Sequence, residues 1–227
     1  MPVILINPNS TAAMTATMLA AARAAAPGLP IEGWTSRDGP PAIQGEADGA
    51  VAAGPLLDLV ERADRQGAEA IVIGCFDDTA LPEARARASC PVIGIGQAAF
   101  HYAALRGRRF SVVTSLPVAV PIIEANIAAY GLSAALARVR ASDVPVLALE
   151  EDPDAALVAI RAEARAAVAE DGAETIVLGC AGMARITAEL RRSLEVPVID
   201  AVEAAAGCAF WLTAGAAIRA TGPASIG

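Results

Sequence analysis

Two cysteines, Cys75 and Cys180, end two copies of nearly the same nine-residue stretch. The copies read GAEAIVIGC from Gly67 and GAETIVLGC from Gly172, and they agree at seven of nine positions. Each copy is an apolar run that is typical of a buried strand, so each thiol follows a strand. A repeat of this length predicts two related half-domains with a cysteine at the same place in each. We therefore expect a site between the two halves.

Two opposed thiols can move a proton from one face of a carbon atom to the other. A thiolate removes the proton, and the opposite thiol protonates the planar carbanion from the other face, which inverts the stereochemistry. Each cysteine is expected at or just before a helix N-terminus, where the helix dipole should lower the thiol pKa and leave one thiolate and one thiol at rest. Backbone N–H groups there could stabilise the developing charge. Such a site needs neither pyridoxal phosphate nor a metal, so we expect no cofactor.

Cysteines also have structural roles, and these remain alternatives. Cys75 and Cys180 could be buried small apolar residues, or they could close a disulfide that acts as a redox switch. Cys90 and Cys208 lie outside the repeated turns and are expected to be structural. His101, the only histidine, is expected in a structural or surface position. With neither a second histidine nor C-x-x-C spacing, we expect no metal site.

Strands and helices alternate around the two cysteine turns. Short apolar runs predict strands at residues 3–6, 31–35, a run ending at 73, 91–95, 110–113, 136–140, a run ending at 180, and 197–200. This alternation predicts parallel sheets built from right-handed crossovers. The expected fold class is α/β, with two pseudo-symmetric Rossmann-like or flavodoxin-like halves, each a four-stranded parallel sheet flanked by helices, and the active site between them. The first half would comprise residues 1–97 plus 204–227, and the second residues 98–203.

The segments between the strands are predicted to be helices and loops. Helices are expected at residues 12–26, 51–67, a run ending at 87, 118–130, runs ending at 170 and 196, and 204–218. The last of these is too short for a membrane span and is expected to be buried. Residues 37–49 and 143–154 are expected to be loops, and the first could fold over the site.

Ligands of open parallel sheets lie beyond the carboxyl ends of the strands. Four turns should meet there, with the sequences NPNST, GCFDD, VTSLP and GCAGM. In the first, Ser10 or Thr11 caps the next helix, which leaves Asn9 and the other hydroxyl free to hold a carbonyl or carboxylate. In the second, Asp77 and Asp78 stabilise the N-terminus of the next helix or, alternatively, contact the substrate.

Charge and composition narrow the range of partners. The formal net charge of −8 at pH 7 disfavours nucleic acid and anionic membranes as partners. The N-terminal stretch MPVILINPNST lacks the basic region of a signal peptide, and four cysteines are too few for a disulfide scaffold. A cytoplasmic location and a small-molecule substrate are therefore expected.

At five stretches the chain resembles the aspartate/glutamate/hydantoin racemase superfamily, and within it the hydantoin and allantoin racemase branch. The stretches are INPNST at 6–11, CFDD at 75–78, FSVVTSLPVAVPIIE at 110–124, ASDVPVLALEE at 141–151 and IVLGCAGMA at 176–184. Glutamate-racemase-like members show Asn-Thr and Thr-His after the two thiols, where this chain has Phe76-Asp77 and Ala181-Gly182. Arylmalonate decarboxylases of the same superfamily keep only the second thiol.

The resemblance implies a cofactor-independent racemase that interconverts D- and L-5-monosubstituted hydantoins, with Cys75 and Cys180 as the two acid/base residues at the C5 carbon. Allantoin, free aspartate or glutamate, or another amino acid are alternative substrates, and a non-catalytic small-molecule sensor is an alternative of a different class. A homo-oligomer is expected. The residues expected to bind the substrate are Asn9, Ser10, Thr11, Phe76, Asp77, Thr114, Ser115, Ala181 and Gly182.

Two departures from the family pattern leave the substrate preference open. Residues 42–47 read AIQGEA, where relatives often have SIEG followed by an aromatic residue or histidine and acidic residues. Ser115 stands where threonine is usual. Neither change touches the thiol pair.

Overall fold

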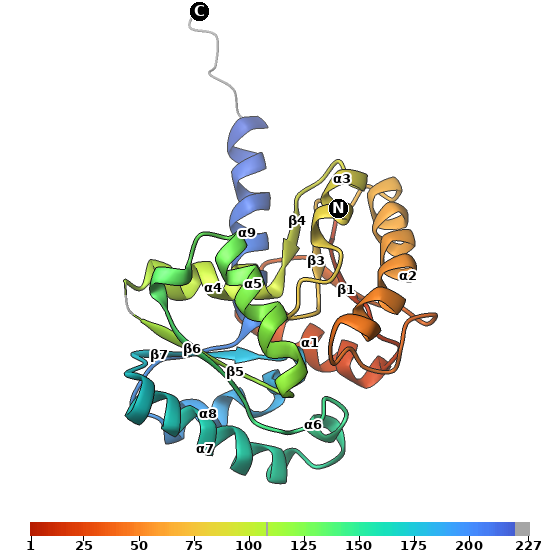
Figure 1. Ribbon diagram of the computed structural model, residues 1–227. Helices are drawn as coiled ribbons and strands as arrows, with labels where there is room; N and C mark the ends of the chain where they lie inside the picture. Colours follow the sequence, from red (N-terminus) through yellow and green to blue (C-terminus); the bar gives the residue numbers. More distant parts are fainter. Residues whose placement is uncertain (108, 221–227) are drawn as a thin grey trace, which may run out of the picture.

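The computed structural model describes residues 1–107 and 109–220, and its strands form two sheets of the same design (Figure 1). Each is a four-stranded parallel sheet, with strand order β2-β1-β3-β4 in the first lobe and β6-β5-β7-β8 in the second. The bounds are β1 Val3–Asn7, β2 Ile31–Thr35, β3 Ala70–Ile73, β4 Val92–Gly94, β5 Phe110–Thr114, β6 Leu136–Ala141, β7 Thr175–Gly179 and β8 Val198–Ile199. The matching order confirms the predicted pseudo-symmetric α/β halves.

Helices connect the strands and flank both sheets. The α-helices are α1 Ala12–Ala25, α2 Glu46–Arg65, α3 Leu81–Arg87, α4 Ile95–Leu105, α5 Val120–Ala129, α6 Ala148–Glu151, α7 Pro153–Asp171, α8 Thr187–Ser193 and α9 Ala201–Ala220. Short 3-10 helices occur at η1 Pro117–Ala119, η2 Ser133–Ala135 and η3 Ala181–Ile186. The first lobe contains β1 to β4, and the second lobe contains β5 to β8.

The central strands of both sheets are buried because helices cover both faces. Every residue of β1, β3, β5 and β7 is buried, whereas the edge strands β2 and β6 are partly exposed. The continuous apolar sequences of the central strands are those expected of parallel strands with two covered faces. The two cysteine turns therefore begin at the ends of rigid, buried strands.

One hydrophobic core joins the two lobes. Phe76 from the first cysteine turn, Phe100 from α4 and Phe110 from β5 are all buried in it. Phe76 lies edge-on to Phe100 with ring centroids 5.2 Å apart, and Phe100 stacks on Phe110 at 6.2 Å. Aromatic pairs of this geometry add stability beyond the area that they bury. The turn after Cys75 is thus anchored between the lobes.

The turn after Cys75 does not open a helix directly, as the sequence predicted. Asp78 and Ala80 both have φ of 50°, a left-handed conformation that an α-helix cannot continue through. Helix α3 begins only at Leu81, so Cys75 does not lie at a helix N-terminus. Cys180, in contrast, is the N-cap residue of η3. The two turns begin alike and then differ in backbone path.

Both predicted loops contain the start of a helix. Helix α2 begins within residues 37–49, and α6 and the start of α7 lie within residues 143–154. Near the start of α2, Asp48 accepts a hydrogen bond from the N–H of Gln44 at 3.0 Å. Asp152 caps α7 through a hydrogen bond to its first turn at 3.1 Å. Carboxylates placed in this way stabilise the starts of both helices.

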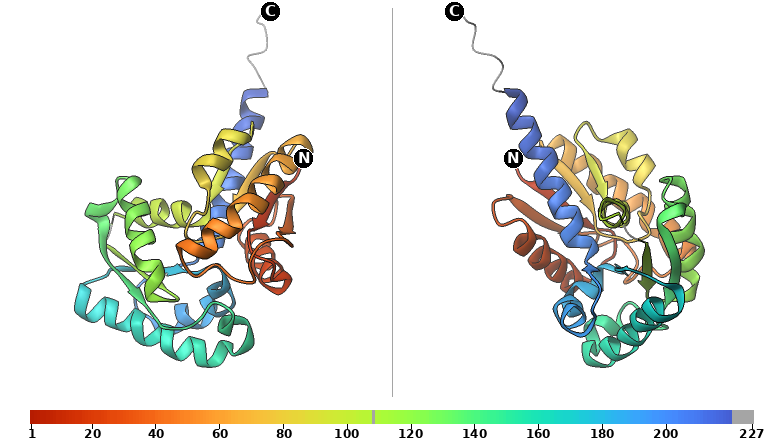
Figure 2. Two further views of the ribbon diagram at one scale, coloured as in Figure 1. Left: turned by 45° about the vertical axis from the view of Figure 1, so that its right-hand side comes forward. Right: turned by 90° about the vertical axis from the view of Figure 1, so that its left-hand side faces the viewer.

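Helix α9 runs past both lobes, and its C-terminal end projects from the body of the protein (Figures 1 and 2). Ala205 and Ala209 are buried, but Phe210, Trp211 and Leu212 are exposed, with Trp211 at 75%. The prediction of a buried helix at 204–218 is therefore wrong for these three residues, because the helix extends beyond the core. Of the helices in the described ranges, none is long and apolar enough to cross a bilayer.

The boundary between the two halves stays a prediction. Helix α9 contacts α1 and β3 of the first lobe and also β7 of the second, and α4 contacts both β4 and β7. These two helices therefore pack against both lobes. We propose that the halves divide between residues 97 and 98 and between residues 203 and 204. Residues 221–227, assigned to the first half from the sequence, lie outside the described residues.

Candidate active site

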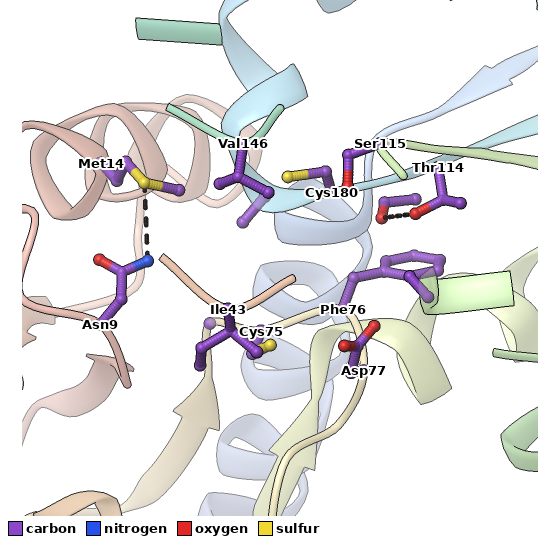
Figure 3. Close-up of a pocket in the computed structure, with 14 residues that line it drawn as sticks. Asn9, Met14, Ile43, Cys75, Phe76, Asp77, Thr114, Ser115, Val146 and Cys180 are labelled. Carbon is purple, nitrogen blue, oxygen red and sulfur yellow. Dashed lines mark hydrogen bonds between the residues drawn. The ribbon is translucent and has the colours of Figure 1, made fainter. Parts of the chain in front are cut away.

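A cavity of about 30 Å³ lies between the lobes, at the carboxyl ends of the central strands (Figure 3). It is lined by Asn9, Met14, Ile43, Gly74, Cys75, Phe76, Asp77, Thr114, Ser115, Ala119, Val146, Gly179, Cys180 and Ala181. Figure 3 shows Cys75 and Cys180 on opposite sides of this space. The two thiols that end the repeated stretches therefore face the same cavity from different lobes.

The Cys75 thiol lies in surroundings that disfavour its ionised form. Burial raises its pKa, and the negative charge of Asp77 raises it further. Two donors act in the opposite direction, namely the Thr79 hydroxyl, 3.3 Å from the sulfur, and the backbone N–H of Asp77. Desolvation outweighs both donors, so the pKa lies well above the ordinary thiol range and Cys75 is a neutral thiol at pH 7.

The Cys180 thiol is also neutral at pH 7, although its local donors differ. Burial raises its pKa to about 12, with smaller contributions from the carboxylates of Asp77 and Glu150. The backbone N–H groups of Gly182 and Met183, at the start of η3, lower it. The predicted lowering of both thiol pKa values is therefore wrong, because burial and nearby negative charge outweigh the backbone donors. The resting state at neutral pH is two thiols.

Asp77 brings a negative charge into the cavity. Burial raises the pKa of its carboxyl group to about 6, so the group is mostly ionised at pH 7. Its carboxylate has no hydrogen-bond partner among the described residues, and none of the described residues that line the cavity is basic. A half-buried carboxylate without a partner is costly, and it is suited to accept hydrogen bonds from the N–H groups of a ligand.

The other predicted binding residues divide into those that line the cavity and those that do not. Thr114 lines it, but its hydroxyl donates to the carbonyl of Gly179 at 3.0 Å and so joins the second lobe's two turns. The hydroxyl of Ser115 has no partner among the described residues and is available to a ligand. The predicted residues that line the cavity are Asn9, Phe76, Asp77, Thr114, Ser115 and Ala181.

Three predicted binding residues lie outside the lining. Thr11 is the N-cap residue of α1, yet its hydroxyl donates to the carbonyl of Pro41 at 2.7 Å and does not cap the helix. Ser10 lines a separate surface groove beside β2 and α2. Gly182 is buried and does not line the cavity, and its backbone N–H lowers the pKa of the Cys180 thiol.

Two loops, one from each lobe, close the cavity. Ile43 covers it from the first lobe and Val146 from the second. The side-chain oxygen of Gln44 accepts a hydrogen bond from the N–H of Val146 at 3.0 Å. Met14 and Ala42 pack with Val146 in a small hydrophobic cluster. The loop before α2 thus folds over the site and is fastened to the opposite lobe.

Thr79 and Gln44 belong to the site, but sequence reasoning missed both. Thr79 follows Cys75 by four residues, a spacing that brings side chains together on a helix. That spacing was the available signal, although the contact forms here in a non-helical turn. Gln44 and Val146 are 102 residues apart, and no local pattern links them.

The remaining cysteines and the histidine lie elsewhere. All four cysteines are free thiols, and Cys90 and Cys208 line a separate pocket with His101. The Nδ1 atom of His101 lies 2.8 Å from the carbonyl oxygen of Gln97. Within the described residues, no group of histidine, cysteine and acidic side chains could hold a metal ion.

Comparisons with known proteins agree with this geometry. The model of the family described as Asp/Glu/Hydantoin racemase matches residues 3–209. Hydantoin racemase of Rhizobium meliloti is 48% identical over 206 residues, which cover 90% of this chain and 86% of that protein. Solved structures of allantoin racemase from Klebsiella pneumoniae and Pseudomonas fluorescens are 42% and 38% identical, with TM-scores of 0.89 and 0.90. Each match covers 95% of this chain, and 89% and 92% of the respective solved chains. The chain therefore belongs to the Asp/Glu/Hydantoin racemase family, and its enzyme class is that of an isomerase, a racemase.

Proposed function

We propose that the protein is a cofactor-independent racemase that interconverts D- and L-5-monosubstituted hydantoins by proton transfer at the C5 carbon. The supporting observation is the pair Cys75 and Cys180 on opposite sides of one cavity whose described lining has no basic side chain. The names of the relatives, hydantoin racemase and allantoin racemase, point to the same class of substrate.

The charge of the cavity favours a neutral ring over a free amino acid. Free aspartate and glutamate carry two carboxylates, which need a cation or several donors when they leave water. The cavity offers the carboxylate of Asp77 instead, and this group repels them. A hydantoin has an N–H group next to its C5 carbon, and this group can donate to Asp77.

In the proposed reaction the two sulfurs exchange roles. One cysteine first loses its thiol proton to solvent and, as a thiolate, accepts the C5 proton, while the electron pair of the C–H bond moves into the neighbouring carbonyl. The opposite thiol then gives its proton to the other face of C5, and the electron pair returns to form the new C–H bond. The first sulfur ends as a thiol and the second as a thiolate, so the reverse reaction uses the same pair with opposite roles.

Hydrogen-bond donors around the cavity can stabilise both the cysteine thiolate and the enolate that forms from the substrate. The Thr79 hydroxyl serves a thiolate at Cys75, and the N–H groups after Cys180 serve a thiolate there. The free hydroxyl of Ser115 can donate to the carbonyl oxygen on which enolate charge develops.

The composition supports a reaction that does not depend on pyridoxal phosphate. None of the 227 residues is lysine, which is the residue that anchors this cofactor in the enzymes that use it. The C5 proton of a hydantoin is already acidified by the adjacent carbonyl. A thiolate at close range is therefore a sufficient base in this proposal.

Racemisation of allantoin is the second candidate, because allantoin racemases are among the similar structures. Allantoin is itself a hydantoin with a ureido group at C5, so the same thiol pair would serve it. A non-catalytic sensor would keep the cavity and bind such a ring without turnover.

Circular dichroism tests the proposal by following the loss of optical activity. Separate D- and L-5-substituted hydantoins, allantoin, aspartate and glutamate are each incubated with the protein. We expect racemisation of hydantoins in both directions. Racemisation of aspartate or glutamate alone would contradict the substrate class, and a thermal shift with hydantoins but no turnover would favour the sensor.

Cysteine variants test the mechanism. We expect Cys75→Ser and Cys180→Ser each to abolish racemisation, and each to keep solvent deuterium exchange at C5 of one enantiomer only. Cys90→Ser and Cys208→Ser are matched controls outside the cavity and should remain active. Full activity in either cavity variant would contradict the two-base mechanism.

We also propose that the enzyme is cytoplasmic and forms a homo-oligomer. The exposed Phe210, Trp211 and Leu212 at the projecting end of α9 support self-association, because exposed aromatic clusters mark interaction surfaces. Analytical ultracentrifugation of the full chain would show whether it is larger than a monomer.

A further inference from the structure

Asp78 does not line the cavity, although it belongs to the same turn as Cys75. It is 5% exposed and accepts three hydrogen bonds. Its two oxygens accept from the backbone N–H groups of Gly96 at 3.0 Å and Gln97 at 2.7 Å. The hydroxyl of Tyr130, at the end of α5, donates to it at 2.9 Å. Asp78 therefore ties the cysteine turn to two helices.

The two backbone hydrogen bonds make Asp78 the cap of α4. The helix begins at Ile95, and its own N-cap residue is Gly94, which has no side chain to accept from the first turn. A Cβ atom at Gly94 would collide with the carboxylate of Asp78. The glycine thus leaves room for a capping group from outside the helix, which satisfies N–H groups that would otherwise lack a partner.

In the second half of the chain, the N–H groups at the start of the corresponding helix are capped by a residue of that helix's own N-terminus. The repeated sequence PVI is followed by Gly94 in the first half and by Asp200 in the second. Asp200 caps its own helix, α9, by accepting from the N–H groups of Val202 at 2.8 Å and Glu203 at 2.9 Å. The turn that carries Cys75 therefore caps the helix of the first half, whereas the turn that carries Cys180 does not cap the helix of the second half.

Further contacts hold the same turn in place. The N–H of Asp78 donates to the carbonyl of Cys75 at 3.1 Å, and the side chain of Asn126 in α5 donates to the carbonyl of Asp77 at 2.8 Å. Asp78 itself has φ of 50°, a conformation that is costly for a residue other than glycine. The carboxylate that holds the turn in this conformation is the one that caps α4.

We propose that Asp78 is a positioning residue for Cys75, because its cap on α4 fixes the turn that holds the Cys75 thiol opposite Cys180. This inference rests on the proposed two-thiol reaction. Loss of the anchor lets the turn move, and a displacement of about 1 Å at a reacting group can cost about a hundredfold in rate. Cys180 lies in the other lobe on a turn with its own backbone donors and is not affected directly.

The first test replaces Asp78 by asparagine, which keeps the size of the side chain but presents an NH₂ group to one of its N–H donors. For Asp78→Asn we expect kcat for racemisation to fall about a hundredfold, with a much smaller change in KM. Solvent deuterium exchange should be lost for the enantiomer that Cys75 deprotonates and kept for the other. Equal loss for both enantiomers would indicate general damage to the fold and would overturn the proposal.

A double variant separates positioning from helix capping. Asp78→Ala combined with Gly94→Asp moves the cap onto α4 itself, as in the second half. We expect the thermal stability lost in Asp78→Ala to recover in the double variant, while racemisation stays low because the turn is still released. Recovery of activity together with stability would show that Asp78 serves only the helix, and the proposal would fall.

Alkylation provides a readout that does not depend on the reaction. Iodoacetamide is added to the wild type and to Asp78→Asn, and the rate of modification of each cysteine is followed by mass spectrometry. We expect Cys75 to react several times faster in the variant and Cys180 to react at an unchanged rate. This result would uphold the positioning of Cys75 even if the wild type racemised no hydantoin, whereas unchanged rates at both cysteines would overturn it.

Discussion

The hydroxyl of Thr79 lies 3.3 Å from the sulfur of Cys75, and it is the only side-chain hydrogen bond to either cavity thiol within the described part of the chain. Burial and the Asp77 carboxylate both disfavour a thiolate at Cys75. The hydroxyl acts against them, because a hydrogen bond to the charged form of a group favours that form. The two thiols thus rely on different donors, a side chain at Cys75 and backbone N–H groups at Cys180.

Replacement of Thr79 should therefore affect one sulfur and not the other. Thr79→Val keeps the shape of the side chain but removes the donor, so the pKa of Cys75 rises further. We expect the rate of deuterium exchange at C5 to fall about ten- to a hundredfold for the enantiomer that Cys75 deprotonates, since a hydrogen bond to a charged group contributes about 1.5–3 kcal/mol. Thr79→Ser is the matched control and should stay near wild type. Equal loss for both enantiomers would contradict this role.

The raised thiol pKa values predict an alkaline pH optimum. Because a thiolate is the base and both thiols are neutral at pH 7, kcat/KM should rise with pH and continue to rise above pH 9, the ordinary thiol pKa. Asp77→Asn removes a negative charge that raises the pKa of both thiols, so the rising limb should move to lower pH by about one unit. Its KM should increase, because the acceptor for the substrate N–H is weakened. Asp38→Asn, at an exposed position, is the control. If the rise of kcat/KM with pH stayed at the same pH in Asp77→Asn, the charge of Asp77 would not raise the thiol pKa values.

The sheets and the thiol pair are visible in the sequence because their signals are local. The apolar runs of β3 and β7 and the repeat that contains them identify both cysteine turns without any three-dimensional information. The thiol pKa values are different, since they depend on burial and on Asp77, which acts across the cavity on Cys180. A cysteine motif at a helix start indicates only the backbone N–H donors that lower the thiol pKa. It does not reveal the burial of the thiol, which raises the pKa by more.

The start of α3 shows the same limit at the level of the backbone. The sequence CFDD, followed by the alanine-rich segment TALPEARARA, is typical of a helix start with acidic residues in its first turn. In the folded chain, Asp78 bonds instead to N–H groups 18 and 19 residues further on, and the helix is delayed to Leu81. Gly94 is the only local sign of this arrangement, and a glycine between a strand and a helix is equally typical of an ordinary turn.

The fastening between Gln44 and Val146 predicts a role in substrate entry. A cavity of about 30 Å³ holds water but is too small for a substituted ring, since ligand pockets usually measure about 300–1,000 Å³. The two loops must therefore separate and close again around the substrate. Gln44→Ala removes the acceptor, and we expect KM to rise about fivefold with little change in kcat, as for the loss of a hydrogen bond of about 1 kcal/mol. Gln44→Glu keeps an acceptor for the N–H of Val146 and is the control. If Gln44→Ala lowered kcat by a larger factor than it raised KM, the contact would serve the chemical step instead.

Arg140 and Asp171, neither of which lines the cavity, form an ion pair that fastens α7 to the edge strand β6. Their side chains are 10% and 8% exposed, and the guanidinium also reaches Glu163 and Glu170. Removal of the arginine leaves the carboxylate of Asp171 with only Arg138 nearby, so Arg140→Ala should lower the free energy of unfolding by about 1.5–3 kcal/mol at pH 7, as measured by urea denaturation. Arg165→Ala, on the exposed face of the same helix, should change it by no more than about 0.5 kcal/mol.

The pH dependence of that loss follows from the carboxyl group. Hydrogen bonds and charge from Arg140 hold the pKa of Asp171 below its ordinary value of 3.8. A lowered pKa contributes stability above the unfolded value, and this contribution disappears as the pH falls through the folded value. The difference in unfolding free energy between wild type and Arg140→Ala should therefore be full at pH 7 and shrink as the pH falls below about 3.8. A difference that stayed constant across this range would mean that Arg140 stabilises the fold through the packing of its aliphatic stem.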